Sequence, residues 1–245
     1  MRKLRTEKDI EKSITCLDIE KEMYLADRFR FHQKNGKVIP LPISKFGSFL
    51  TGTGTELIYS NPTVGTAKTT FTTEFMINDT AGMGPAPVLP AWFFMPSRSR
   101  SQAIRIVARG ITSVTATPTW IWTFRLNPVV TPAVPPTGPN VGSTGTLTAL
   151  TGVTNQLWEA ELDVQLTLEG AAGSNSTVRG LGRLLAPGLF TTVAGMAIFG
   201  SGASPGTVAT VDISLLNTLT VGSTCGTSSA SNSIQLLQLL VFGLN

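Results

Sequence analysis

Residues 157–169 read Leu-Trp-Glu-Ala-Glu-Leu-Asp-Val-Gln-Leu-Thr-Leu-Glu, and polar and apolar side chains alternate along this stretch. One face would carry Glu159, Glu161 and Asp163, and the other would carry Trp158 and Leu162. Such alternation is typical of a strand that has one face on a core and the other in water, as in antiparallel sheets. The stretch therefore predicts a half-buried antiparallel strand.

Shorter candidate strands lie on both sides of this one, separated by turn residues. They are predicted over residues 55–60, 69–77, 91–95, 102–109, 112–126, 177–185, 193–199, 207–215, 218–221 and 234–244. Prolines crowd residues 128–139, which we expect to form an extended surface loop because proline cannot donate to a sheet. This order of elements predicts an all-β jelly roll or β-sandwich of roughly 8–10 antiparallel strands.

The composition agrees with a β-rich body and narrows the possible functions. The 245 residues are 42% hydrophobic and only 14% charged, where about 25% charged is usual. A coiled coil, a long-helix bundle and a charge-rich disordered chain are excluded. The chain is long enough to bury a sizeable core.

Charge is concentrated at the start of the chain. Residues 1–50 hold 11 basic and 7 acidic side chains, whereas residues 51–245 hold 8 of each. We therefore divide the chain into a charged N-terminal arm, residues 1–50, and a β jelly-roll domain, residues 51–245. In the arm, residues 10–17 have the apolar spacing of a short helix, and Asn35-Gly36 is a hairpin signal.

The basic residues of the arm are candidate anchors to a larger assembly. Acidic residues are interleaved with them, which favours docking on a neighbouring protein over nucleic acid, and a plain solvated helix is a further interpretation. The candidate anchoring residues are Arg2, Lys3, Arg5, Lys8 and Lys12.

A second basic cluster lies in the β region, just after the aromatic run Trp92-Phe93-Phe94. This cluster has three possible interpretations: solvated or local ion pairs, a protein interface, and nucleic-acid binding. All three stay open because arginine pairs with carboxylates as well as with phosphates. The overall neutrality of residues 51–245 makes nucleic acid the least favoured. The candidate interface residues are Arg98, Arg100, Arg105 and Arg109.

Little in the sequence indicates catalysis, a metal or a cofactor. His32 is the one histidine, and it lies beside the predicted hairpin turn in the charged arm. Glu159, Glu161 and Asp163 would share one strand face, but a solvated polar row explains them better than a glycosidase site. Cys16 and Cys225 form no metal-ligand motif. We expect a non-enzyme that has no cofactor, no metal and no membrane span. Since residues 1–9 do not have the pattern of a secretory signal and the two cysteines are unpaired in sequence, we also expect synthesis in a reducing cytoplasm.

Two segments of the chain resemble known proteins. The first is Trp158–Val164, the turn of residues 170–176 and the strand of residues 177–184, and the second runs from Val211-Asp212 through residues 217–221 and 226–234 to Leu244-Asn245. They resemble the C-terminal parts of a group of tailed-bacteriophage virion proteins. Thr224-Cys225 stands where that group commonly has an aromatic residue. The resemblance covers roughly residues 155–245 and implies a jelly-roll module, a role in the virion and a homo-oligomer, usually a trimer.

We expect, on this basis, a capsid decoration or cement subunit that stabilises a phage head by binding the major capsid protein. The first alternative is a tail or fibre module that binds a host receptor or glycan, with Trp120, Trp122 or Trp158 facing solvent. The second alternative is a jelly-roll shell protein that encloses the genome and turns its arm toward nucleic acid.

Overall fold

The computed structural model describes residues 31–34, 37–40, 55–78, 83, 85–94, 103–129, 135–191, 196–200 and 208–244. The chain divides into two units, Met1–Gly54 and Thr55–Asn245.

The described part of the first unit is a pair of strands. Strand β1 (Phe31–Lys34) pairs antiparallel with β2 (Lys37–Pro40), and His32 lies opposite Ile39. This is the pairing that the Asn-Gly signal predicts. The helix predicted over residues 10–17 lies outside the described residues.

The second unit is built from strands that are long in the middle of the sheet and short at its margins. They are β3 (Thr55–Ser60), β4 (Lys68–Thr69), β5 (Phe75–Met76), β6 (Val88–Leu89), β7 (Ala103–Val114), β8 (Thr119–Asn127), β9 (Asn140–Ser143), β10 (Leu147–Thr148), β11 (Val153–Leu168), β12 (Ser176–Leu185), β13 (Met196–Gly200), β14 (Ala209–Val211), β15 (Asn217–Cys225) and β16 (Ser233–Leu244). A short 3-10 turn, η2 (Ala171–Gly173), joins β11 to β12.

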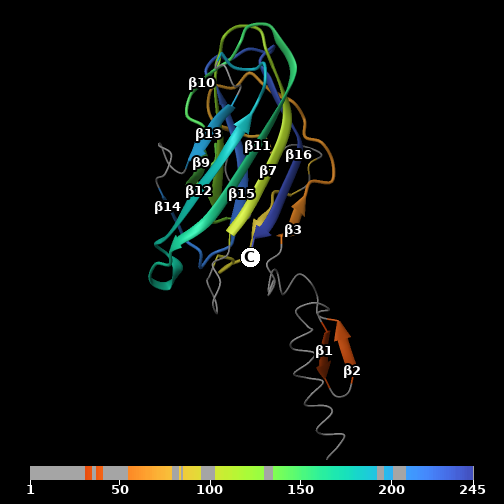
Figure 1. The fold of residues 1–245 in the computed structure, drawn as a ribbon, viewed down its shortest axis with the longest axis vertical. Coiled ribbons are helices and arrows are strands. Elements are labelled where there is room, and N and C mark those ends of the chain that lie inside the picture. Colours follow the sequence, from red (N-terminus) through yellow and green to blue (C-terminus); the bar gives the residue numbers. More distant parts are fainter. Residues whose placement is uncertain are drawn as a thin grey trace, which may run out of the picture. The chain divides into compact units, whose positions relative to one another are not determined.

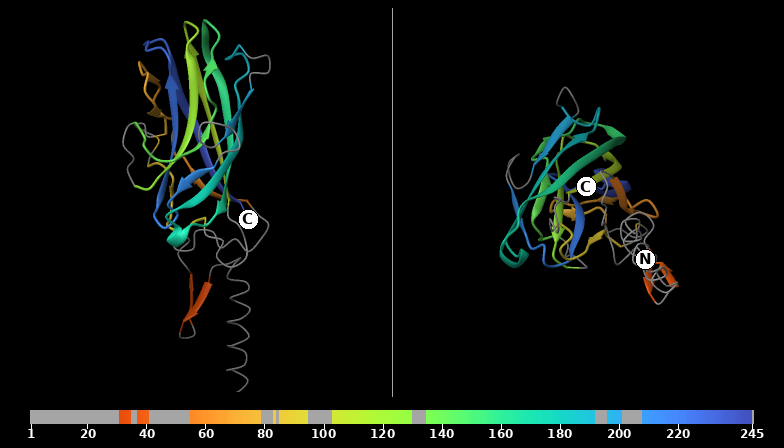
Figure 2. Two further views of the ribbon diagram at one scale, coloured as in Figure 1. Left: turned by 90° about the vertical axis from the view of Figure 1, so that its left-hand side faces the viewer. Right: turned by 60° about the horizontal axis from the view of Figure 1, so that its bottom comes forward.

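These strands form an antiparallel β-sandwich. One layer runs β3-β16-β7-β11-β12-β13, and its four longest members lie side by side in Figure 1. The other layer runs β9-β8-β15-β5, and the pair Gly200 and Ser143 joins β13 to β9 at the corner between the layers. Figure 2 shows the layers from two further directions. The expected all-β sandwich is therefore confirmed.

Aromatic side chains fill the space between the two layers. Trp122 on β8 meets Trp158 on β11, with ring centroids 5.9 Å apart, and Trp120 lies 5.7 Å from Trp122. At the other end of β8, Phe124 meets Phe199 of β13 at 5.1 Å. Each of these rings is 2% exposed or less. Since large aromatic side chains dominate the energetics of a core, these contacts hold the layers together.

Gly110 on β7 makes room for one of these indoles. A Cβ at this position would lie 2.0 Å from the carbonyl oxygen of Gln235 and 2.5 Å from the ring of Trp158. Only glycine allows β16 and the indole to approach β7 this closely.

Several of the predicted strands are wrong in extent or kind. In the described part of the segment 207–215, only Ala209–Val211 (β14) are a strand, and residues 213–215 form a turn. The segment 69–77 is interrupted, because Thr70 has φ of 60° and the chain turns before β5. Residues 91–94 form a turn with Trp92 at φ 64°, and the short strand β6 precedes it. The segment 112–126 is two strands, β7 and β8, joined by a turn that ends at Pro118. In each case a local backbone reversal overrides the β propensity of the side chains.

Candidate binding face

The solvent-facing side of the layer β3-β16-β7-β11-β12-β13, which we call the outer face, carries the described arginine-carboxylate pairs of the long strands. Alternation along each strand turns every second side chain outward. The register then places Arg109 beside Glu159, Arg105 beside Asp163, and Glu161 beside Arg183. We call these six side chains the ionic stripe.

Hydrogen bonds hold the ionic stripe in one arrangement. Arg105 donates from Nε and Nη2 to the two carboxylate oxygens of Asp163, at 2.7 and 2.8 Å. Glu161 lies between two arginines, 3.2 Å from Arg105 Nε and 3.2 Å from Arg183 Nη2. The forked contact with Asp163 is the geometry that arginine forms best with a carboxylate.

The remaining arginine of the stripe extends the network toward β16. Arg109 donates from Nε to Glu159 at 2.5 Å and from Nη1 to Gln238 at 2.7 Å. Three neighbouring strands, β11, β7 and β16, are therefore cross-linked at the surface by this one guanidinium.

The ion pairs of the stripe fix the positions of its side chains but add little to the free energy of folding. Its arginines are 41–56% exposed, so solvent screens the pairs. Exposed ion pairs of this kind are worth about 0.2–1 kcal/mol each. The hydrogen bond to Asp163 raises the pKa of Arg105 above its usual range, so this guanidinium stays charged at every physiological pH.

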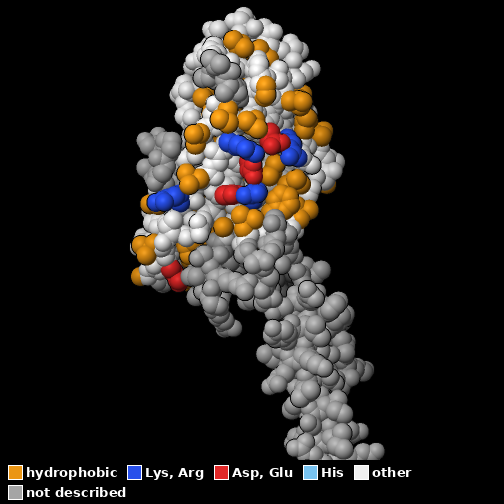
Figure 3. Space-filling view, viewed as in Figure 1, with side chains coloured by type: hydrophobic (Ala, Val, Ile, Leu, Met, Phe, Trp, Pro, Cys, Tyr) orange, Lys and Arg blue, Asp and Glu red, His pale blue; other side chains and the backbone are white. Residues whose placement is uncertain are grey.

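Exposed apolar side chains flank the stripe on both sides. Figure 3 shows hydrophobic groups around a central patch of blue and red on this face. The most exposed flanking side chains, in chain order, are Leu57 (52%), Leu157 (63%), Leu181 (48%), Met196 (46%) and Ile198 (61%). Exposed apolar side chains beside fixed charges are typical of a binding surface.

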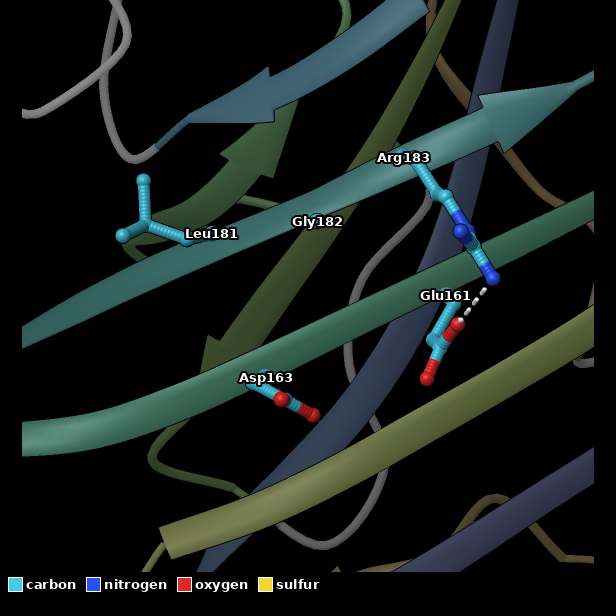
Figure 4. A pocket seen from close by; sticks show the side chains of 5 residues that line it. All are labelled: Glu161, Asp163, Leu181, Gly182 and Arg183. Atoms are coloured by element: carbon cyan, nitrogen blue, oxygen red, sulfur yellow. Dashed lines mark ion pairs between the residues drawn. The ribbon is translucent and has the colours of Figure 1, made fainter.

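An open pocket of about 410 Å³ lies at the β11–β12 end of the stripe, lined by Glu161, Asp163, Leu181, Gly182 and Arg183. In Figure 4, Arg183 reaches from β12 toward Glu161 on β11, while Leu181 and Asp163 lie farther along the same two strands. Arg183 is the most exposed arginine of the stripe and has one contact at 3.2 Å. It keeps donors for a ligand, and the two carboxylates keep acceptor lone pairs.

The predicted basic cluster is divided by the structure. Arg105 and Arg109 are both in the ionic stripe, each paired with carboxylates of β11. Arg98 and Arg100 lie outside the described residues, as do the arm residues Arg2, Lys3, Arg5, Lys8 and Lys12. Sequence reasoning missed Arg183 and Gln238, because only the pairing register shows that they face β11 and β7.

The carboxylates that sequence analysis weighed as a glycosidase pair have arginine partners. Glu159 pairs with Arg109, and Asp163 pairs with Arg105. Glu161 pairs with Arg105 and with Arg183. Among the described residues, no three His, Cys, Asp or Glu side chains are grouped so that they could hold a metal ion. The described part of the chain also has no helix with the length and hydropathy to cross a membrane.

The aromatic residues expected to face solvent in a receptor-binding module do not do so. Trp120 and Trp122 are fully buried and Trp158 is 2% exposed, so the sequence prediction for these three is wrong. Their place between the two layers explains the burial. Trp92, in the turn after β6, is the tryptophan that is partly exposed, at 40%.

Comparison with known proteins gives structural neighbours only. No family model matches the chain, and no curated protein matches it. One similar solved structure is the CBM2 module of the evolved Dit of Lactobacillus casei BL23 phage J-1, with 13% identity, 78% of this chain and 96% of that chain covered, and a TM-score of 0.32.

Two plant lectins are also similar. Lectin I from Ulex europaeus, solved with the methyl glycoside of α-L-fucose, has 9% identity over 76% of this chain and 97% of its own, with a TM-score of 0.31. Metal-free lectin I-B4 from Griffonia simplicifolia has 10% identity over 82% and 97%, with a TM-score of 0.29. Likenesses at this level say nothing about what the present chain binds.

Proposed function

We propose that this chain is a non-catalytic attachment module of a bacteriophage particle, of the tail or fibre type, that binds a receptor on the host surface through its outer face. The resemblance of residues 155–245 to phage virion proteins supports the location in a particle. The pocket lined by Glu161, Asp163 and Arg183 carries the binding role.

The pocket suits a polar ligand because its charged groups are already held in place. Asp163 is fixed by two hydrogen bonds from Arg105, and Glu161 by contacts with two arginines. A ligand that binds here need not order these side chains, which lowers the cost of binding. Hydroxyl or amide groups of a cell-surface receptor could donate to the carboxylates and accept from Arg183.

Binding of labelled protein to cells of the host bacterium tests this function. We expect saturable binding by the wild type and a loss of about tenfold in affinity for Arg183→Ala, since a hydrogen bond to a charged group is worth about 1.5–3 kcal/mol. Arg179→Ala is the matched control, because Arg179 is an exposed arginine four positions away on the same strand and face but outside the pocket.

Equal cell binding by Arg183→Ala and Arg179→Ala would show that the pocket does not bind the receptor. Absence of cell binding by the wild type would contradict the attachment role.

Head decoration is the second candidate, and the exposed apolar flanks of the outer face favour it. Ile198 and Leu157 are both more than 60% exposed, and burial of such side chains against shell subunits would contribute about 25 cal/mol per Å². The copy number of the protein in purified particles separates the candidates. Hundreds of copies would indicate a coated head, and a handful would indicate a tail.

A further inference from the structure

Trp92 stands apart from the other three tryptophans of the chain. It lies in the turn of residues 91–94 and is 40% exposed, whereas Trp120, Trp122 and Trp158 are buried in the core. An indole has one of the largest apolar surfaces of any side chain, so leaving it in water costs free energy.

The backbone at Trp92 is held in a conformation that a bulky residue rarely adopts. Its φ is 64°, in the left-handed region, where glycine is the usual residue. The Trp92 N–H donates to the carbonyl oxygen of Ile213 at 2.6 Å, which fixes the turn against the chain before β15. Since glycine would suit this backbone better, the turn itself does not require the indole. Strained residues of this kind gather at ligand sites.

Two other segments, η2 and the chain before β15, lie beside Trp92. A Cβ at Gly173 of η2 would lie 2.7 Å from the Trp92 ring and 3.0 Å from the Ser214 nitrogen. The indole and the backbone of Ser214 are therefore both close to Gly173. The carboxylate of Asp212 accepts hydrogen bonds from the Ser214 N–H, at 2.9 Å, and from the Ser214 hydroxyl. Asp212 forms no ion pair with any residue that the structure describes.

We propose that Trp92, Asp212 and Ser214 form a saccharide-binding site at this end of the sandwich, separate from the pocket of the outer face. The apolar C–H face of a sugar ring stacks on the indole, and ring hydroxyls bond to the carboxylate and the serine hydroxyl. Stacking on an aromatic ring is worth about 1–3 kcal/mol for a flat ligand such as a nucleobase, and a sugar face uses the same surface. The site does not depend on what the outer face binds.

Indole N–H resonances of the full chain, recorded by NMR, report on this site directly because the other three tryptophans lie in the core. The probes are maltotriose, cellotriose, triacetylchitotriose and L-rhamnose, each titrated separately. We expect the Trp92 resonance to shift with at least one probe while the other three stay in place, and Asp212→Asn to weaken the binding several-fold.

Trp92→Gly separates binding from folding. It removes the indole and relieves the strained φ, which offsets part of the burial lost with the ring, so we expect the protein to stay folded while saccharide affinity falls about tenfold or more. Arg179→Ala, at an exposed residue that belongs to neither site, is the control that should leave saccharide binding unchanged.

Two results would overturn the site. One is the absence of a Trp92 shift with all four probes, and the other is unchanged probe binding by Trp92→Gly. A shift produced by tetramethylammonium but by none of the sugars would assign the indole to a cationic ligand and would likewise contradict the proposal. Each outcome leaves the host-cell test of Arg183 unaffected.

Discussion

Gly110 is one of the residues of the sandwich at which neighbouring groups leave no space for a side chain. Gly110→Ala should destabilise the protein by about 3 kcal/mol, because the added methyl would collide with the Trp158 ring and the Gln235 carbonyl. Gly243→Ala is the control. Its new methyl would meet only the flexible end of Ile58, at 3.3 Å, and should cost less than about 1 kcal/mol. Urea unfolding curves measure both values, and equal costs would mean that the Trp158 contact does not constrain the core.

Cys225 makes the free energy of unfolding of the sandwich depend on pH in the alkaline range. It is 1% exposed, and burial raises the pKa of its thiol above the ordinary value. Above that ordinary value the unfolded thiol loses its proton while the folded thiol keeps it. The stabilising contribution is therefore complete at lower pH and is lost as the pH rises.

The measurement compares Cys225 with Cys225→Ala, both in a Cys16→Ser background. Between about pH 8 and about pH 10, unfolding free energy should fall more in the chain that retains Cys225. Iodoacetamide should modify Cys225 only after unfolding. Rapid labelling of the folded chain would show that this thiol is accessible.

At the scale of elements, one buried ion pair ties a loop to the second layer of the sandwich. Glu74, in the segment before β5, accepts from Arg125 of β8 at 2.7 Å, and Arg125 also donates to the Gly138 carbonyl oxygen. The two side chains are only 13% and 22% exposed. Glu74→Gln should therefore cost about 2–3 kcal/mol, because it leaves a charged guanidinium without its partner in a poorly solvated place.

Glu159→Gln provides the comparison on the outer face. It breaks the pair with Arg109, which is 46% exposed, and should cost about 0.2–1 kcal/mol. Thermal melts of the two variants would contradict this ranking if the outer-face substitution proved the more costly.

Most of the long strands were predictable from sequence, and several of the turns between them were not. The alternation of residues 157–169 is found in β11, where Trp158 and Leu162 are buried and Glu159 and Glu161 face solvent. The segment 91–95 is apolar and aromatic, which suits a strand, yet hydrogen bonding to Ile213 holds it in a turn. Such long-range contacts are not encoded in local periodicity.

The candidate site was predictable only in part, for the same reason. Alternation alone placed Arg105 on one face of its strand and the carboxylates on one face of theirs. That β7 and β12 lie on either side of β11, with Arg105 opposite Asp163 and Arg183 opposite Glu161, depends on the pairing register. The three tryptophans expected at the surface alternate on β8 and β11 as predicted, but the second layer covers them.

At the scale of the whole molecule, six charged side chains of β7, β11 and β12 form the ionic stripe, while the core consists of apolar side chains from both layers. Fixed charges between apolar flanks are typical of a binding surface. An attachment module of this kind would act in several copies per particle, and multivalent contact would raise the avidity for a cell surface.

Competition for phage adsorption tests the attachment role most directly. Excess purified protein, added to host cells before the phage, should slow adsorption of the particles in proportion to its occupancy of the cells. Arg179→Ala should compete as well as the wild type, and Arg183→Ala should need about tenfold more protein for the same effect. Unchanged adsorption at saturating protein, together with hundreds of copies in each particle, would contradict the attachment role and leave head decoration as the function.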